Sequence, residues 1–446
     1  MESMIYTISA FILAIVILVG VHEFGHFWVA RKYGVKVLKF SIGFGKPIFT
    51  WRRKNDPTEY SIGLIPLGGY VKMLDEREGS IPEHEREFEF NNKSLTARSM
   101  IVFAGPAFNF LFAIFAIWLT LVIGSRDYAP VVGQVLEESV AEQVGFELGD
   151  QLVQIDGRPV KSWRQHQLYL MNRAMQGRQT KFTVETSDNE SKELEVDFGY
   201  LDQQRIVGQP ITSIIGIGPP PPPAKILNPV IGMPADRAGL ISGDLITSLD
   251  DEVILDWVDL ANKISTQPGK QTALTVIRDG QEFEVMVVPD TIDVNGTPMG
   301  RIGIYRPEPE GMMFRLGPVE SMWQSVEQSY LLTIVTLKSI GRMITAQMSA
   351  DNLSGPITIA RVAGRTAESG VTEFLSFLAL ISISLGLLNL LPIPILDGGH
   401  LLYFLYEGIT GKKPSEEAQL IGQKIGISAI ILLTIFAFYN DIMRLF

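Results

Sequence analysis

The segment from Met4 to Ala30 constrains the fold more than any other part of the chain. It is an apolar run long enough to cross a lipid bilayer, and Arg31 and Lys32 end it abruptly. No positive charge precedes the run, so it is not predicted to be a cleaved signal peptide. We therefore expect residues 1–30 to form a first transmembrane helix.

This predicted helix carries the motif His22-Glu23-Phe24-Gly25-His26. On a helix His22 and His26 are one turn apart and share a face, so two imidazole nitrogens can reach one cation. Glu23 can then act as the general base for a water molecule, which is the pattern of a zinc-protease helix. The alternative is a core in which these side chains only form hydrogen bonds. Ionisable groups at membrane depth are costly and usually functional, which favours the metal site.

Composition narrows the class of protein. The 446 residues suffice for several domains, and the net charge of -11 argues against a nucleic-acid-binding protein. The chain has no cysteine. Thiolate sites and disulfides are therefore excluded, and zinc would have to be held by histidine and carboxylate.

Residues 31–99 are rich in lysine and arginine, which indicates a cytoplasmic region and an inward-running first helix. Within this region, residues 60–74 are patterned like a membrane-associated β-hairpin with its turn at Pro66, Gly68 and Gly69. One interpretation is an ordinary cytoplasmic turn. The other is a strand at the membrane edge that offers backbone hydrogen bonds to an extended substrate.

Three further apolar segments predict transmembrane helices at residues 100–124, 373–397 and 423–443. The segment at residues 100–124 contains Gly105, Pro106 and Asn109, which favour a kink, close helix packing and a hydrogen bond to a neighbouring helix. Residues 320–348 are apolar but carry Lys338 and Arg342. We expect an amphipathic helix at the outer membrane surface there, with a further span as the rival.

Between these segments lies a sequence repeat at an offset of 94 residues, the difference between Gly239 and Gly145. Gly145-Phe-Glu-Leu-Gly149-Asp150 matches Gly239-Leu-Ile-Ser-Gly243-Asp244, and Trp163 matches Trp257. Two copies of one β-rich domain are therefore predicted at 126–215 and 224–309, joined by a stiff proline-rich linker at 216–223. Each Gly-Asp turn resembles the PDZ signature of bacterial proteases. The pair can bind peptide at a sheet edge or act only as a size filter.

The third predicted span ends in Asn389-Leu-Leu-Pro-Ile-Pro-Ile-Leu-Asp397-Gly398-Gly399-His400. Asp397 can supply a third metal ligand, or it can cap the following helix. His400 is an alternative third ligand. If the amphipathic segment does not cross, the first and third spans run in the same direction, which brings Asp397 to the depth of His22 and His26.

Taken together, these motifs resemble the site-2 proteases, intramembrane zinc metalloproteases, and within them a branch from Gram-negative bacteria. The resemblance rests on the His22–His26 motif, on Gly105-Pro106-x-x-Asn109, on the tandem repeat and on the Asn389–Gly398 motif. It implies a multi-pass α-helical membrane protein with four transmembrane helices and two tandem extracytoplasmic PDZ domains, located in the bacterial inner membrane with its active site near the cytoplasmic side. The five-proline stretch is not expected from the family pattern.

The resemblance also implies roles for individual residues. His22, His26 and Asp397 would bind Zn²⁺ and Glu23 would activate water. Asn389 and the segment around Gly68, Gly69 and Tyr70 would hold the substrate. Substrates would be single-pass membrane proteins, among them a membrane-anchored anti-sigma factor and signal-peptide remnants. The alternative function is a non-catalytic membrane PDZ scaffold or receptor with a structural metal site.

Overall fold

The computed structural model describes residues 2–54, 56–76, 79, 81–201, 206, 209–294, 297–305, 311–347 and 354–444. The chain forms two compact units. The first comprises Met1–Ser125 and Arg315–Phe446, and the second comprises Arg126–Phe314. The predicted ends of the second repeat at residue 309 and of the amphipathic helix at 348 lie outside the described residues.

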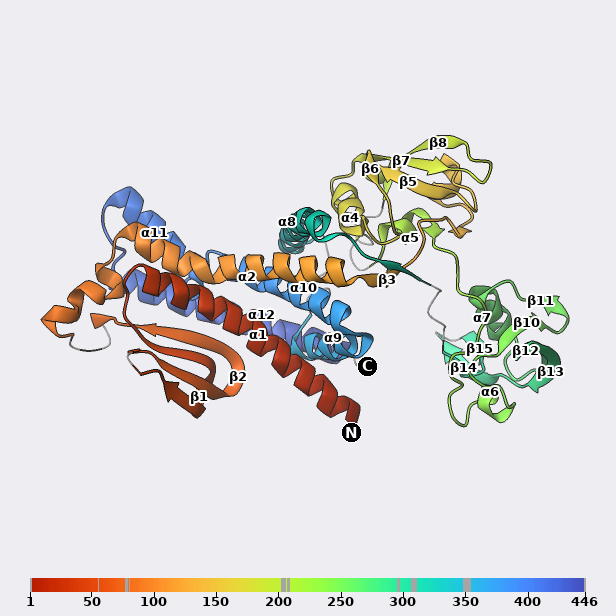
Figure 1. Ribbon diagram of the computed structural model, residues 1–446, viewed down its shortest axis with the longest axis horizontal. Helices are drawn as coiled ribbons and strands as arrows, with labels where there is room; N and C mark the ends of the chain where they lie inside the picture. Colours follow the sequence, from red (N-terminus) through yellow and green to blue (C-terminus); the bar gives the residue numbers. More distant parts are fainter. Residues whose placement is uncertain are drawn as a thin grey trace. The chain divides into compact units, whose positions relative to one another are not determined.

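Helices dominate the first unit (Figure 1). They are α1 (Glu2–Lys32), α2 (Leu95–Ile123), α8 (Pro318–Ile344), α9 (Pro356–Ser369), α10 (Val371–Asn389), α11 (Asp397–Thr410) and α12 (Glu416–Met443). Among the described residues, α1, α2, α10 and α12 are long and apolar enough to cross a membrane. In Figure 1, α1 and α10 run toward the end of the unit that holds α11, and α2 and α12 run away from it.

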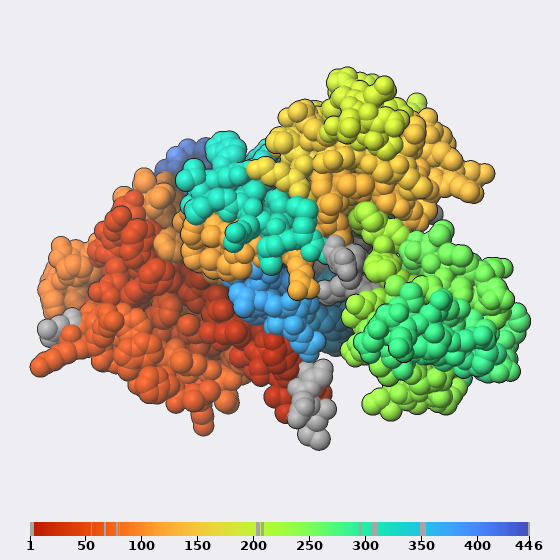
Figure 2. All heavy atoms as spheres, turned by 45° about the vertical axis from the view of Figure 1, so that its right-hand side comes forward, coloured from red at the N-terminus to blue at the C-terminus, as the bar shows by residue number. Residues whose placement is uncertain are grey.

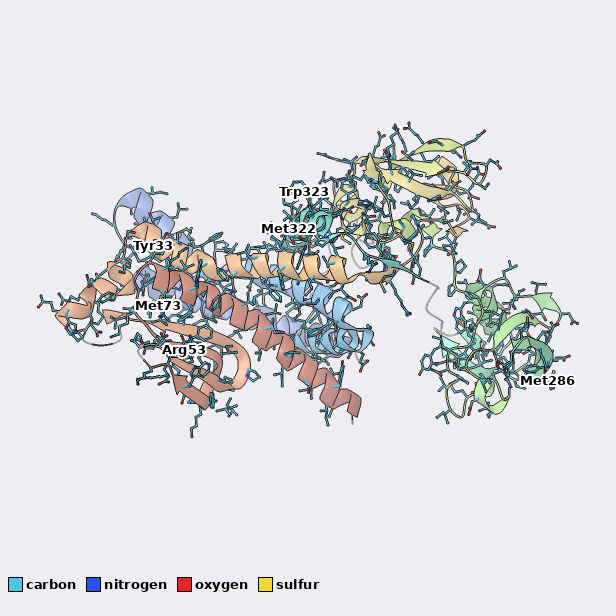
Figure 3. The ribbon with its side chains drawn as sticks, in the orientation of Figure 1. Tyr33, Arg53, Met73, Met286, Met322 and Trp323 are labelled. Carbon is cyan, nitrogen blue, oxygen red and sulfur yellow. The ribbon has the colours of Figure 1, made fainter. Side chains whose placement is uncertain are left out.

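Helix α8 crosses the spanning helices instead of running along them. Figure 1 views it nearly end-on, and Figure 2 shows it lying over α2. Its buried face consists largely of small residues, Ser321, Ser325 and Ser329, which allow a close approach. Large apolar side chains such as Met322 and Trp323, labelled in Figure 3, are exposed. This geometry matches the amphipathic surface helix more closely than the rival span.

Helix α10 ends earlier than the predicted span of 373–397. It stops at Asn389, and residues 390–396 form turns before α11 begins at Asp397. Pro392 and Pro394 cannot donate backbone hydrogen bonds, so the helix cannot continue through them. As a result the end of α10 at Asn389 and the start of α11 at Asp397 are brought back toward one another around a compact turn.

The β-hairpin beside α1 is larger than predicted, because two long strands fold back together. Strands β1 (Val37–Arg52) and β2 (Glu59–Met73) pair in antiparallel fashion, and the chain reverses between them. The chain does reverse around the predicted turn residues Pro66, Gly68 and Gly69, within β2: residues 59–62 and 69–73 both pair with the start of β1, and their registers run in opposite directions. Gly68 takes part in this reversal with a φ of 119°.

Because both strands fold back, the start of β1 pairs with both arms of β2, and the end of β1 pairs with the start of β2. Ser41 lies opposite both Tyr70 and Ser61, while Thr50 also pairs with Ser61. The lateral order is therefore the end of β2, the start of β1, the start of β2 and the end of β1. The segment from Gly69 to Met73 thus forms one edge of this sheet.

The second unit contains two four-stranded sheets of the same topology, with strand orders β6-β5-β7-β8 and β11-β10-β12-β13. The first comprises β5 (Gln151–Ile155), β6 (Arg158–Pro159), β7 (Gln179–Glu185) and β8 (Ser191–Asp197). The second comprises β10 (Leu245–Leu249), β11 (Glu252–Val253), β12 (Thr272–Arg278) and β13 (Gln281–Val287). Each sheet carries a helix after its second strand, α4 (Gln167–Met175) or α7 (Trp257–Ser265). The sequence repeat is therefore also a structural repeat.

Shorter elements complete the second unit. They are β3 (Ser125–Asp127), β4 (Gln134–Val135), α3 (Val140–Val144), α5 (Ile211–Ile215), β9 (Ile217–Gly218), α6 (Pro234–Arg237), β14 (Asp290–Val294), β15 (Thr297–Arg301) and β16 (Met312–Phe314). Strand β9 pairs with β4, so the first copy extends to Gly218, three residues into the predicted linker.

Equivalent positions show where the two copies differ. The N–H of Leu136 donates to the carbonyl of Gly216, and the N–H of Val230 donates to that of Gly303. The residues before these glycines form the helical turn α5 in the first copy and strand β15 in the second.

Candidate metal centre and substrate cavity

Three predicted ligands meet at one end of the helices of the first unit. The Nε2 atoms of His22 and His26 lie 3.2 Å apart. The Oδ2 atom of Asp397 lies 3.3 Å from Nε2 of His22 and 3.5 Å from Nε2 of His26. Helix α1 supplies the histidines at adjacent turns, and the first residue of α11 supplies the carboxylate.

The donor set fits a divalent cation such as zinc. All three ligand atoms lie within 4.8 Å of one another, and both histidines are buried. Oδ2 of Asp397 is buried and accepts no hydrogen bond from the described residues, although it faces two imidazole nitrogens. A buried carboxylate oxygen without a donor is costly, and a bound cation would compensate it.

Helix α2 orients both imidazoles from behind. Nδ1 of His26 lies 2.8 Å from the carbonyl oxygen of Ile101, so its N–H donates there and Nε2 keeps a lone pair. The amide of Asn109 contacts Nδ1 of His22 at 3.1 Å. Oxygen and nitrogen of such an amide are assigned from the hydrogen-bond network.

The orientation of the Asn109 amide determines the His22 tautomer. With Nδ2 toward the ring, Oδ1 of Asn109 is buried without a partner. With Oδ1 toward the ring, the Nδ1–H of His22 donates to it and Nε2 is free to bind a metal. Only the second orientation leaves Nε2 of His22 with a lone pair for a metal. The backbone carbonyl of Asn109 also accepts a hydrogen bond from Ser382 of α10 at 2.8 Å.

Two glycines allow these helices to approach so closely. A Cβ atom on Gly105 would lie 2.3 Å from Nε2 of His26, and one on Gly25 would lie 2.4 Å from the carbonyl oxygen of Ala104. Sequence reasoning predicted close helix packing at Gly105 but did not single out Gly25. The signal was the small-residue run around Ala104 on the second span.

A charged pair anchors the helix that begins with Asp397. Arg98 of α2 binds Glu407 of α11 through two hydrogen bonds, of 2.7 and 3.1 Å. The guanidinium also lies over the ring of Phe404, 5.0 Å from its centroid. The Arg98 hydrogen bonds hold the pKa of Glu407 below its usual value, so this pair stays charged at neutral pH. Sequence analysis did not identify this pair, because its members are 309 residues apart.

A cavity of 620 Å³ opens at the three ligands. Every predicted site residue lines it: His22, Glu23, His26, Gly68, Gly69, Tyr70, Asn389 and Asp397. His400 lines the cavity too, but it is not part of the ligand cluster. The residues that sequence reasoning drew from three distant segments therefore share one space.

The edge of the hairpin sheet forms one wall of this cavity. A Cβ atom on Gly69 would lie 2.9 Å from Cγ of Glu23 and 2.7 Å from the carbonyl oxygen of Ser41. Only glycine lets the strand come this close to the helix. An extended peptide paired with the Gly69–Met73 edge would thus pass beside Glu23.

Comparison with known proteins agrees with this geometry. The model of Peptidase family M50 matches residues 10–433. Regulator of sigma-E protease RseP of Escherichia coli K12 is 38% identical over 453 residues, covering all of both chains. A putative zinc metalloprotease of Vibrio cholerae is 40% identical over 460 residues, again covering all of both chains.

A solved PDZ domain of an SdrC-like protein from Listeria monocytogenes is 23% identical to this chain. The alignment covers 18% of this chain and 84% of the PDZ-domain chain, with a TM-score of 0.17. This likeness is too slight to assign a fold. The family model and the full-length relatives carry the assignment. The chain belongs to peptidase family M50 and is a membrane zinc metalloprotease of the site-2 protease type.

Proposed function

We propose that this protease hydrolyses a peptide bond within the transmembrane segment of single-pass membrane proteins. The observation that carries the proposal is the convergence of His22, His26, Asp397 and Glu23 on one cavity between helices that are apolar enough to span a bilayer. We infer that the three ligands hold zinc. Bound zinc would supply Lewis acidity toward the scissile carbonyl and toward water.

In this mechanism Glu23 acts as the general base. Its carboxylate accepts a proton from the attacking water and then returns it to the leaving amine. His26 and His22 keep their Nε2 lone pairs directed into the site because Ile101 and Asn109 bind the opposite ring nitrogens. Asn389 can donate a hydrogen bond to the oxyanion from the opposite wall.

The substrate must be extended before it can be cut, because a helix shields its own peptide bonds. We infer that it pairs with the Gly69–Met73 edge of β2, which supports the role predicted for Gly68, Gly69 and Tyr70. Residues that weaken helices, such as glycine, should therefore favour cleavage near the cut site.

We further infer an inner-membrane location, with the metal centre near the cytoplasmic side and the repeat unit outside, from the lysines and arginines of residues 31–54. The relatives named as regulators of sigma-E protease suggest a membrane-anchored anti-sigma factor as substrate, with signal-peptide remnants as a second class. The two repeat copies would be PDZ domains that bind peptide or exclude substrates whose outer domain is intact.

The second copy supports peptide binding more than the first does. A cavity of 140 Å³ lies between α7 and the strand segment that ends at Ile304, lined by Trp257, Leu260 and Ile264 among others. In the first copy the equivalent segment folds into α5, whose Thr212 contacts Gln167 of α4 at 3.2 Å.

The deciding experiment compares wild type with Glu23→Gln. A tagged single-pass membrane peptide is incubated with purified protein in detergent, and bound zinc is measured in both samples. Loss of cleavage with zinc retained would support Glu23 as the base. Glu87→Gln, an exposed change outside the cavity, serves as the control and should cleave normally. Equal cleavage by Glu23→Gln and wild type would overturn the mechanism, whereas no cleavage by either protein, with zinc bound in both, would favour the scaffold alternative.

A further inference from the structure

A second groove lies on the first unit, away from the metal centre. It has a volume of 620 Å³ and is lined almost entirely by apolar side chains. Helix α1 contributes one wall, α2 a second and strand β1 a third. The lining residues used below are Val16, Gly20, Phe24, Phe108, Leu111 and Ile42.

The groove occupies the face of α1 opposite the histidines. Residues 16, 20 and 24 follow one another at intervals of four, so they line one side of the helix. At about 100° per residue, His22 and His26 point to the other side. None of the described residues lines both cavities. The groove is therefore separate from the catalytic cavity.

Aromatic residues extend the groove toward the Lys32 end of α1. Trp28 lies one turn beyond Phe24 and contacts the ring of Phe108, with 5.8 Å between ring centroids. Phe24 contacts the same ring at 5.9 Å. Trp28 is 45% exposed. Tryptophan in this position is typical of the boundary between hydrocarbon and head groups.

The positively charged side chain of Lys32 lies at this end of the groove. The ammonium group of Lys32 lies 4.6 Å from the centroid of the Trp28 ring. Within the described part of the chain no carboxylate pairs with it, whereas the neighbouring Arg31 binds Asp56 at 2.9 Å. Lys93 brings a second positive charge, since its Nζ would lie 3.5 Å from a Cβ atom on Gly34. The exposed ring of Tyr33, labelled in Figure 3, lies beside them in the sequence.

The length of the groove distinguishes between possible occupants. From Val16 to Trp28 the helix rises about 18 Å at 1.5 Å per residue. One leaflet of a bilayer has a hydrocarbon depth of about 15 Å. A transmembrane helix would need about 30 Å of length and about 10 Å of width. An acyl chain that begins at a head group near Lys32 fits this groove, and a second helix does not.

We propose that this groove binds one acyl chain of an anionic phospholipid, with Lys32 and Trp28 holding its phosphate-bearing head group. The proposal rests on the membrane placement of α1 in the proposed function but not on the zinc chemistry. Figures 1 and 2 show α1 beside the hairpin and α2, at the surface of the unit. The lipid would sit against the outer side of the helix that carries the metal ligands.

Native mass spectrometry of the full chain tests the proposal. The protein is released from detergent containing equal amounts of phosphatidylglycerol and phosphatidylcholine, and the retained lipids are counted. We expect one phosphatidylglycerol retained with about fivefold preference, the amount that one lysine near a membrane surface contributes. Lys32→Glu should abolish this preference. Leu111→Trp, which fills the groove, should reduce retention of both lipids.

Lys424→Glu is the matched control, because it makes the same charge change on an exposed residue of α12. It should leave the preference unchanged. Equal retention of both lipids by wild type, or equal loss of preference in the Lys32 and Lys424 variants, would overturn the proposal. Since cleavage is not measured, this result is independent of whether Glu23 acts as the base.

Discussion

Two carboxylates of the first unit, Asp397 and Asp441, are both largely removed from solvent, yet their surroundings differ. Asp441 is 1% exposed, and both of its oxygens accept hydrogen bonds. The donors are the backbone N–H groups of Gly355, Ile357 and Thr358, at 2.8–3.1 Å, and the Thr358 hydroxyl, at 2.6 Å. Asp397 has an oxygen without any such donor, directed at two imidazoles.

The difference separates a structural acid from a ligand. Asp441 caps the N-terminus of α9 and ties it to the end of α12, so its partners are complete within the chain. In the same fold, Oδ2 of Asp397 accepts no hydrogen bond from the described residues. A buried acid with an unfilled acceptor in a cavity is where a cation is expected, and a saturated one is not.

The largest expected effect follows from removing the incomplete acid. We predict that Asp397→Ala lowers cleavage by at least about a thousandfold and abolishes zinc binding, because one of three ligands is lost. The unfolding temperature of the zinc-free protein should fall little, since Oδ2 only faces the two imidazoles, at 3.3 and 3.5 Å, and accepts no hydrogen bond from the described residues. Cleavage assays, zinc analysis and thermal unfolding of the chelated protein check this.

Asp188→Ala, at an exposed turn of the repeat unit, provides the control and should change neither cleavage nor zinc content. If Asp397→Ala retained full zinc occupancy, His400 would have to be the third ligand. A loss of stability in the zinc-free Asp397→Ala variant would mean that Asp397 is a structural acid like Asp441.

The second prediction removes the complete acid. Asp441→Ala should cost about 2–4 kcal/mol of stability, because it leaves three backbone N–H groups at the start of α9 without acceptors. Zinc content should stay unchanged. Denaturant unfolding of the purified full chain measures the cost, with Lys424→Ala on the exposed face of α12 as the control. A variant as stable as wild type would contradict the capping role.

Sequence patterns predicted one of these acids and missed the other for a physical reason. His22, Glu23, His26 and Asp397 stand out because ionisable residues are rare in apolar runs, and helix direction places them at one depth. Asp441 lies near the end of the predicted fourth span, and its sequence context assigns it no role. Its partners are 83–86 residues away, a separation that no local pattern encodes.

The hairpin teaches the same lesson. Glycine and proline in residues 60–74 indicated a turn, and the chain does reverse there, but its two arms flank the start of β1 instead of pairing with each other. A Cβ atom on Gly63 would lie 2.6 Å from the carbonyl carbon of Gly43, so the glycine allows close contact with a partner strand that the sequence did not reveal. Whether a glycine makes a turn or a close approach depends on that partner.

Asp56 lies beyond the C-terminal end of α1, outside the candidate membrane spans. It gives the smallest expected effect and extends the comparison to a third acid. Burial alone would raise the pKa of Asp56, but hydrogen bonds from the Thr58 backbone N–H and the Arg31 side chain outweigh it and lower the pKa to about 2. Its partners lie within the chain, as those of Asp441 do. It should therefore behave as a structural acid.

Because the folded pKa of Asp56 lies below its ordinary value, its contribution to stability is complete above about pH 4 and is lost as the pH falls toward 2. We predict that Asp56→Asn removes about 1–2 kcal/mol at pH 6 and almost nothing at pH 2. Denaturant unfolding at pH 2–6 measures both curves, with Glu416→Gln as the control. Parallel curves for Asp56→Asn and wild type would show that the hydrogen bonds to Asp56 do not favour its charged form. Hydrogen-bond partners within the chain would then be an insufficient criterion for a structural acid. The distinction between Asp397 and Asp441 would rest on zinc binding alone.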